Sequence, residues 1–192
     1  CTPSKTGLPH EYILAAAKIA NVDRIFTIGG AQAIAAMAYG TETVPKVDLI
    51  CGPGNIFVTL AKKQVYGDVG IDGIYGPTET MIVADETADP ELCIYDLMAQ
   101  DEHDEQSIPT LVTTSHQIAE FVQKSWKTLA EEMDRKSIIC ASMENRGSIV
   151  VVNSLSEAIE LVNIIAPEHV SLVTKNPHEL VLKIRNAGMV FV

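Results

Sequence analysis

Basic residues are scarce in this sequence of 192 residues. It contains 14 Lys and Arg against 25 Asp and Glu, which gives a formal net charge of −11 at pH 7. A nucleic-acid-binding surface needs clustered Lys and Arg to contact phosphates, so this composition argues against a nucleic-acid partner. The same charge is equally compatible with a cytoplasmic enzyme and with other acidic proteins.

Long apolar runs are missing as well. No stretch approaches the ~20 apolar residues of a membrane-spanning helix, so we expect no membrane partner. The residues are 47% hydrophobic and 20% charged, which is typical of a globular protein. No basic-then-apolar leader opens the chain, and its first residue is Cys1 rather than Met. We therefore expect a cytoplasmic location and a chain that is a fragment of a longer one.

Cysteines are few and far apart, at positions 1, 51, 93 and 140. They form no C-x-x-C pair, which argues against both a disulfide framework and a zinc knuckle. We expect reduced thiols, as in a cytosolic protein.

Strand and helix patterns alternate along the chain, and a glycine-rich stretch at 67–76 interrupts them. This alternation is typical of parallel sheets with covering helices. We predict an α/β fold of two incomplete Rossmann-like units with mostly parallel sheets, divided into residues 1–72 and 73–192. The first unit is predicted to contain helices at 8–20, 31–39 and 55–65 and strands at 24–28 and 47–51. The second is predicted to contain helices at 90–103, 115–133, 154–165 and 177–187 and strands at 80–84, 109–114, 148–152, 170–174 and 189–192.

The APEH sequence at 166–169 places a carboxylate beside an imidazole. The apolar run before it has helical spacing, and Pro167 should end that helix because it lacks an N–H and moves residue 166 away from helical angles. Glu168 and His169 then form a turn that leads into a strand. Such a pair can supply two proton-transfer groups of different pKa near neutral pH. Alternatively, the pair is a solvated turn, since most polar loop residues have no catalytic role.

A second polar cluster, QDEH at 100–103, follows another apolar-periodic stretch. Gln100 and His103 are three residues apart, so on a helix they share one face. Imidazole is a common zinc ligand and a side-chain amide oxygen a rarer one, but two residues cannot complete a four-coordinate site. Alternatively, this is a polar helix end whose acidic residues, Asp101 among them, are solvated.

Two glycine turns, at 29–30 and 52–54, each lie between a predicted strand and a predicted helix. Exposed N–H groups and the helix dipole at such a turn suit an anionic phosphate. Neither turn has the G-x-G-x-x-G pattern of dinucleotide-binding proteins. The glycines can equally serve only to make tight turns, and Asn55 can be only a helix cap.

Six short sequences, in this order along the chain, resemble the histidinol dehydrogenase family: GGAQAIAA at 29–36, AYGTETVPKVD at 38–48, GPGN at 52–55, GPTE at 76–79, AQDEH at 99–103 and APEH at 166–169. Their order and spacing match the family over nearly the whole chain. Three residues depart from the family pattern. Thr78 stands where the family usually has a serine, and Tyr75 and Asp101 replace small residues.

The resemblance implies a role for specific residues. Gln32 and Asn55 correspond to contacts with NAD. Gln100 and His103 correspond to two zinc ligands that also touch the substrate. Thr78 corresponds to a further substrate contact.

By the same resemblance, Glu168 and His169 are the acid–base residues. His169, which also touches the substrate, would take the alcohol proton as hydride leaves. Glu168 would activate water for attack on the aldehyde.

The family oxidises L-histidinol through the aldehyde to L-histidine with two NAD and one water, at the end of histidine biosynthesis. The resemblance also implies Zn²⁺ and a homodimer with a shared active site. The remaining zinc ligands of the family, an Asp and a His, lie beyond position 192, and the His comes from the partner subunit. We therefore expect residues 1–192 alone to be inactive.

Three other functions fit the residues. The first is a related dehydrogenase that acts on another small amino or hydroxy alcohol. The second is an aldehyde dehydrogenase with Cys51 or Cys93 as its nucleophile, although neither has a nearby basic residue to lower its pKa. The third is a non-catalytic α/β assembly module.

Overall fold

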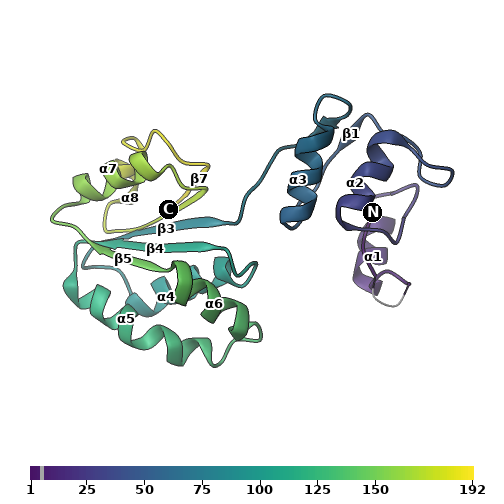
Figure 1. The fold of residues 1–192 in the computed structure, drawn as a ribbon. Helices are drawn as coiled ribbons and strands as arrows, with labels where there is room; N and C mark the ends of the chain where they lie inside the picture. Colours follow the sequence, from purple (N-terminus) through teal and green to yellow (C-terminus); the bar gives the residue numbers. More distant parts are fainter. Residues whose placement is uncertain (5–6) are drawn as a thin grey trace. The chain divides into compact units, whose positions relative to one another are not determined.

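The computed structural model describes residues 1–4 and 7–192, and its described chain forms two compact units (Figure 1). Unit 1 is Cys1–Gly76 and unit 2 is Pro77–Val192. Each unit combines a parallel sheet with helices. The predicted α/β fold is therefore confirmed. Among the described residues, no helix has both the length and the apolar character needed to cross a membrane.

Unit 1 is built on a minimal two-stranded parallel sheet. Leu49 pairs with Gly70 and Ile50 pairs with Ile71. Its elements in chain order are α1 (Glu11–Ile19), α2 (Gly30–Tyr39), β1 (Leu49–Ile50), α3 (Ile56–Val65) and β2 (Gly70–Ile71). A small core of Ile34, Ala38, Ile50, Val65 and Val69 lies between the sheet and its helices. The predicted helices of this unit are all present, with shifts of a few residues at their ends.

The strand predicted at 24–28 is wrong for the part of the chain that the structure describes. The segment is rich in β-branched residues, but a strand needs a neighbour to complete its hydrogen bonds. Here the Phe26 carbonyl accepts a single backbone bond from Thr2 N–H, at 2.9 Å, in place of a ladder. Because no strand among the described residues lies beside this segment, its local propensity does not produce a strand.

Unit 2 contains a five-stranded parallel sheet in the order β5-β4-β3-β6-β7. The strands are β3 (Glu79–Ala84), β4 (Ile108–Thr113), β5 (Ser148–Val151), β6 (His169–Val173) and β7 (Met189–Phe191). The central strand, β3, is buried from its second residue to its last. Such a continuous buried run is expected where helices cover both faces of a parallel sheet.

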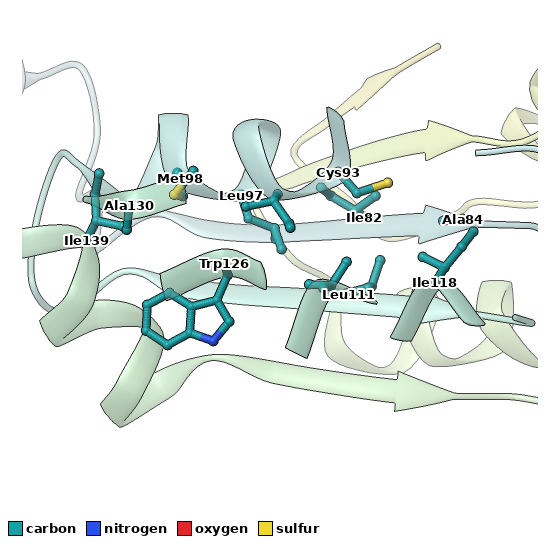
Figure 2. Packing of buried hydrophobic residues seen from close by; sticks show 12 residues of the cluster. Ile82, Ala84, Cys93, Leu97, Met98, Leu111, Ile118, Trp126, Ala130 and Ile139 are labelled. Carbon is teal, nitrogen blue, oxygen red and sulfur yellow. The ribbon is translucent and has the colours of Figure 1, made fainter. Parts of the chain in front are cut away.

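The helices of unit 2 lie on both faces of this sheet (Figure 1). One face carries α4 (Pro90–Asp101), α5 (His116–Ala130) and α6 (Lys136–Arg146), and the other carries α7 (Leu155–Ile165) and α8 (Pro177–Val181). On the first face, Ile82 and Leu111 pack against helix residues that include Trp126 (Figure 2). On the second, Val83 and Val170 pack against α7. Alternate residues of β3 and of β4 thus pack into two separate cores.

The helix predicted at 115–133 is shorter in the structure than in the prediction. The helix that follows it, α6, was not predicted. α5 ends at Ala130, and a turn leads to Lys136. Arg135, the residue before α6, makes no side-chain capping bond, so the start signal for this helix in the sequence is weak. Only Ile139 and Ser142 of α6 are buried. Such a narrow buried face gives a weak helical pattern.

A capping box opens α7, the helix that leads to the APEH sequence. Ser154 Oγ accepts a bond from Glu157 N–H at 3.2 Å, as the S-x-x-E pattern predicts. Glu157 Oε2 accepts from Asn153 N–H at 2.9 Å, one residue earlier than in the usual box. Two N–H groups at the helix start are therefore satisfied by side chains.

Replacing Ser154 should lower the stability of the protein. We expect Ser154→Ala in the full-length protein to reduce the free energy of unfolding by about 1 kcal/mol, the usual cost of losing an N-cap. Urea denaturation followed by circular dichroism measures it. Ser156→Ala, an exposed change inside the same helix, is the matched control and should be close to neutral. Equal effects of the two changes would contradict the role given to the cap.

Candidate functional site

The end of α7 positions the carboxylate and imidazole of the APEH sequence. Ala166 adopts the left-handed conformation (φ 55°) and its N–H bonds to the Val162 carbonyl, so the helix ends just before Pro167, as predicted. The Glu168 carbonyl then accepts a bond from Met189 N–H at 2.8 Å. This turn is thereby fixed to β7 before the chain enters β6.

Glu168 and His169 lie next to each other in space as well as in sequence. The Glu168 Oε1 to His169 Nε2 distance is 4.0 Å; the glutamate is exposed and the histidine is half-buried. The rings of His169 and of Phe191 in β7 lie edge to face, with their centroids 5.7 Å apart. His169 Nδ1 is buried and has no hydrogen-bond partner in the described part of the chain. An imidazole with an unsatisfied nitrogen can accept a proton from a ligand or donate one to it.

Beside His169 lies a pocket of about 290 Å³, formed by unit 2 alone. It is lined by Thr80 of β3, Asp96 and Gln100 of α4, His169 and Ser171 of β6, Phe191 of β7, and the neighbouring Leu172, Val173 and Val192. Its volume is near the lower end of the range for small-molecule sites, and it combines a few polar groups with apolar walls. Two residues predicted from separate motifs, Gln100 and His169, therefore line the same pocket.

Strand register explains why these side chains converge. Thr80 is paired with His169 and Ile82 with Ser171, so the first and third residues of β6 lie on the same face as Thr80. Thr80 is only 3% exposed, and its Oγ1 has no partner among the described residues. A buried hydroxyl without a partner in a pocket wall is available to a bound ligand.

Four further residues of the pocket were not predicted as site residues: Thr80, Asp96, Ser171 and Phe191. Thr80 and Ser171 lie within strands and gave no signal. Asp96 lies four residues before Gln100 on α4, which places the two on one helix face. That spacing was present in the sequence and would have identified Asp96.

Gln100 and His103 do not both line the pocket. α4 ends at Asp101, and His103 lies on the turn beyond it, where its N–H bonds to the Gln100 carbonyl at 3.4 Å. His103 is exposed and does not line the pocket that Gln100 enters. Within residues 1–4 and 7–192, no three His, Cys, Asp or Glu residues form a metal-binding group. Catalytic zinc usually has three protein ligands, so Gln100 and His103 fit zinc only as part of a ligand set.

Asp101 is buried in the core, so its interpretation as a solvated residue is wrong. Ser142 Oγ of α6 lies 3.0 Å from Asp101 Oδ1 and 3.0 Å from the Ser107 carbonyl oxygen. Burial raises the pKa of Asp101 to about 7, although the bond with Ser142 opposes the shift. Because α6 was not predicted, the sequence could not show this partner. The residue that departs from the family pattern here thus packs away from the pocket.

Asn55, Gln32 and Thr78 occupy the ends of helices and strands. Asn55 caps α3, with its Oδ1 accepting from Val58 N–H at 3.2 Å, so the capping role is confirmed. Gln32 is exposed in the first turn of α2, whose N-cap Gly29 makes no side-chain bond. Thr78 directly precedes β3, and its carbonyl accepts from Ile108 N–H at 2.9 Å. Helix N-termini of this kind suit phosphate groups, which leaves a cofactor role open to Gln32 and Asn55.

Comparison with known proteins identifies the family. The family model for histidinol dehydrogenase matches residues 1–192. The chain belongs to the histidinol dehydrogenase family. A histidinol dehydrogenase of Clostridium acetobutylicum is 50% identical over 189 residues, which are 98% of this chain and 44% of that protein. One from Dehalococcoides mccartyi is 51% identical over 98% of this chain and 43% of that protein.

A solved structure supports the same assignment. The crystal structure of histidinol dehydrogenase from Elizabethkingia anophelis matches with a TM-score of 0.92 and 37% identity, over 99% of this chain and 44% of that one. The chain thus spans less than half the length of the relatives that it matches.

The contact between Ser142 and Asp101 leads to a prediction about the end of α4. Ser142→Ala in the full-length protein should lower the free energy of unfolding by about 1–3 kcal/mol, because it leaves buried polar atoms of Asp101 and Ser107 without a partner. Chemical denaturation measures the change. Ser137→Ala, an exposed serine on the same helix, serves as the control. A Ser142→Ala protein as stable as the control would contradict this bonding pattern.

Proposed function

We propose that the full-length protein oxidises L-histidinol through the aldehyde to L-histidine, with two NAD and one bound Zn²⁺, at the end of histidine biosynthesis. The observation that carries the proposal is the pocket in which Gln100 and His169 meet, in a chain of the histidinol dehydrogenase family. Oxidation of an alcohol to an acid needs a proton acceptor and then an activated water. The chain supplies an imidazole and a carboxylate at one place for these two tasks.

His169 is proposed to take the alcohol proton. Its ring is fixed at the start of β6 and against Phe191, and its half-buried position leaves it accessible from the pocket. Glu168 is proposed to take a proton from the water that attacks the aldehyde. It is the more exposed of the two, which suits a group that must reach a water molecule. Thr78 is proposed to form a further contact with the substrate.

Gln100 and His103 are proposed to contribute a carboxamide oxygen and an imidazole to zinc. Zinc would supply a positive charge that holds the substrate through its amino and imidazole nitrogens, and NAD would supply the hydride acceptor. Gln32 and Asn55, at the N-terminal ends of α2 and α3, are proposed to contact NAD. The further zinc ligands would come from outside residues 1–192, in a cytoplasmic homodimer with a shared active site. Residues 1–192 alone are then expected to be inactive.

The structure weighs against a thiol mechanism at Cys93. This cysteine is buried, and burial raises the pKa of its thiol to about 11, with Asp96 and Asp89 adding to the shift. A thiol with so high a pKa is a poor nucleophile near neutral pH. Cys51 is exposed, so it remains accessible, but it does not line the pocket.

Separate assays of the two oxidation steps test the roles of Glu168 and His169. Glu168→Gln in the full-length protein should slow the oxidation of the aldehyde at least about tenfold more than that of the alcohol, since only the aldehyde step needs an activated water. His169→Ala should slow both steps. The measurements are initial rates of NAD reduction with histidinol and with histidinal. Equal losses on both substrates for Glu168→Gln would contradict the proposed division of roles.

A further inference from the structure

A buried lysine in unit 1 holds the glycine turn that precedes α3. Lys62 is 3% exposed, whereas its neighbour Lys63 is exposed. The Lys62 ammonium donates to the Gly52 carbonyl and to the Asp72 carboxylate. Burial of an ammonium is costly unless it is paired and hydrogen-bonded, so these two contacts are what allow Lys62 to lie there.

Asp72 binds the N–H of Gly52, whose carbonyl is bound by Lys62. Asp72 Oδ2 accepts from Gly52 N–H at 2.8 Å, while Oδ1 accepts from Lys62 and from Gly73 N–H. The Gly52 N–H and the Lys62 ammonium lower the pKa of Asp72 to about 2. Asp72 N–H also bonds to the Ile50 carbonyl, one step beyond the register of β1 and β2. Lys62 and Asp72 together therefore bind both the N–H and the C=O of Gly52.

Gly52 has no side chain that could pack against the rest of the unit, so hydrogen bonds to its backbone must hold it in place. Its φ of 125° is one that residues with a side chain rarely adopt, and a Cβ built there would touch nothing within 4 Å. Three residues later, Asn55 caps α3. The hydrogen bonds to Gly52 are thus the fixed point from which the 52–55 turn reaches the N-terminus of that helix.

Tyr75 covers this pair. The Lys62 ammonium lies 5.9 Å from the centre of the Tyr75 ring. The Tyr75 hydroxyl donates to the Asp72 carbonyl at 3.2 Å, and the Tyr75 carbonyl accepts from Thr59 Oγ1 at 3.0 Å. A small residue at this position would leave the ammonium without the ring. This contact gives a structural role to one of the residues that depart from the family pattern.

We propose that the Lys62–Asp72 pair is a positioning device that holds the 52–55 turn in the shape that binds the dinucleotide. The inference rests on the proposed function, in which Asn55 contacts NAD. Lys62 is too deeply buried to touch a ligand itself, so it acts through Gly52. A buried ion pair is often no more stabilising than an apolar pair, and its value can lie in fixing one geometry.

Variants of the full-length protein test this positioning role. Lys62→Met should raise both the Kd and the KM for NAD about tenfold, as expected for the loss of roughly one charge-assisted hydrogen bond to the turn. The kcat at saturating NAD should change little. Lys63→Met, the exposed neighbour on the same helix, should leave both constants unchanged. Calorimetric titration with NAD and steady-state kinetics give these values.

A double variant separates positioning from stability. In Lys62→Met the Asp72 carboxylate loses its ammonium partner, and adding Asp72→Asn removes that unpaired charge. The unfolding midpoint of the double variant should therefore lie closer to that of the unchanged protein than the midpoint of Lys62→Met does. NAD affinity should stay weak, because the Gly52 carbonyl still lacks its donor. A double variant that binds NAD normally, or that fails to fold, would overturn the inference. If the unchanged protein does not bind NAD, the proposed function fails too; if it binds and Lys62→Met binds equally well, only the inference fails.

Discussion

The parallel pairing of β3 with β6 is the contact on which the candidate site depends. Register places His169 beside Thr80, and it directs His169 and Ser171 to the face that α4 covers only in part. Because side chains alternate along a strand, a slip of one residue would move His169 into the opposite core, among the residues that pack on α7. Such a slip would be costly, because the side chains of β3 are buried alternately in the two cores. The packing of this strand therefore determines where the imidazole lies.

The pocket does not lie where the sheet order alone would place it. The chain runs from β3 outward to β4 and β5 and then returns to β6 on the other side of β3, which is a topological switch point. Ligands usually bind beyond the carboxyl ends of the strands at such a point. Here Thr80 and His169 lie near the amino ends, and the pocket runs along the sheet face between α4 and β7.

Local signals predicted most helices and strands, because their causes are local. The capping box at Ser154, the stop at Pro167 and the glycine after α2 each act through neighbours in the chain. The strand at 24–28 failed because a strand depends on a partner that no local pattern reveals. The turn after α5 and the helix α6 were missed because α6 has weak start signals and a narrow buried face. The missed helix α6 led to the incorrect assignment of Asp101 to solvent, because α6 carries its partner Ser142.

In the candidate site, too, residues marked by local motifs could be predicted and residues placed by tertiary contacts could not. Gln100 and His169 could be found from their motifs, and the structure places both in one pocket. Thr80 and Ser171 could not, since only register makes them neighbours of His169. Lys62 gave no sign either, because its burial depends on Asp72 and on the backbone of Gly52. Residues that act through tertiary contacts are those that a single sequence does not reveal.

We propose that this chain is part of an enzyme that oxidises an alcohol to an acid at one site. The most direct test is the stoichiometry of the full-length protein with limiting L-histidinol and excess NAD. We expect two NADH per histidinol, with L-histidine as the only product formed from it, because each of the two oxidations reduces one NAD. One NADH per histidinol with accumulation of the aldehyde, or no NADH at all, would contradict it.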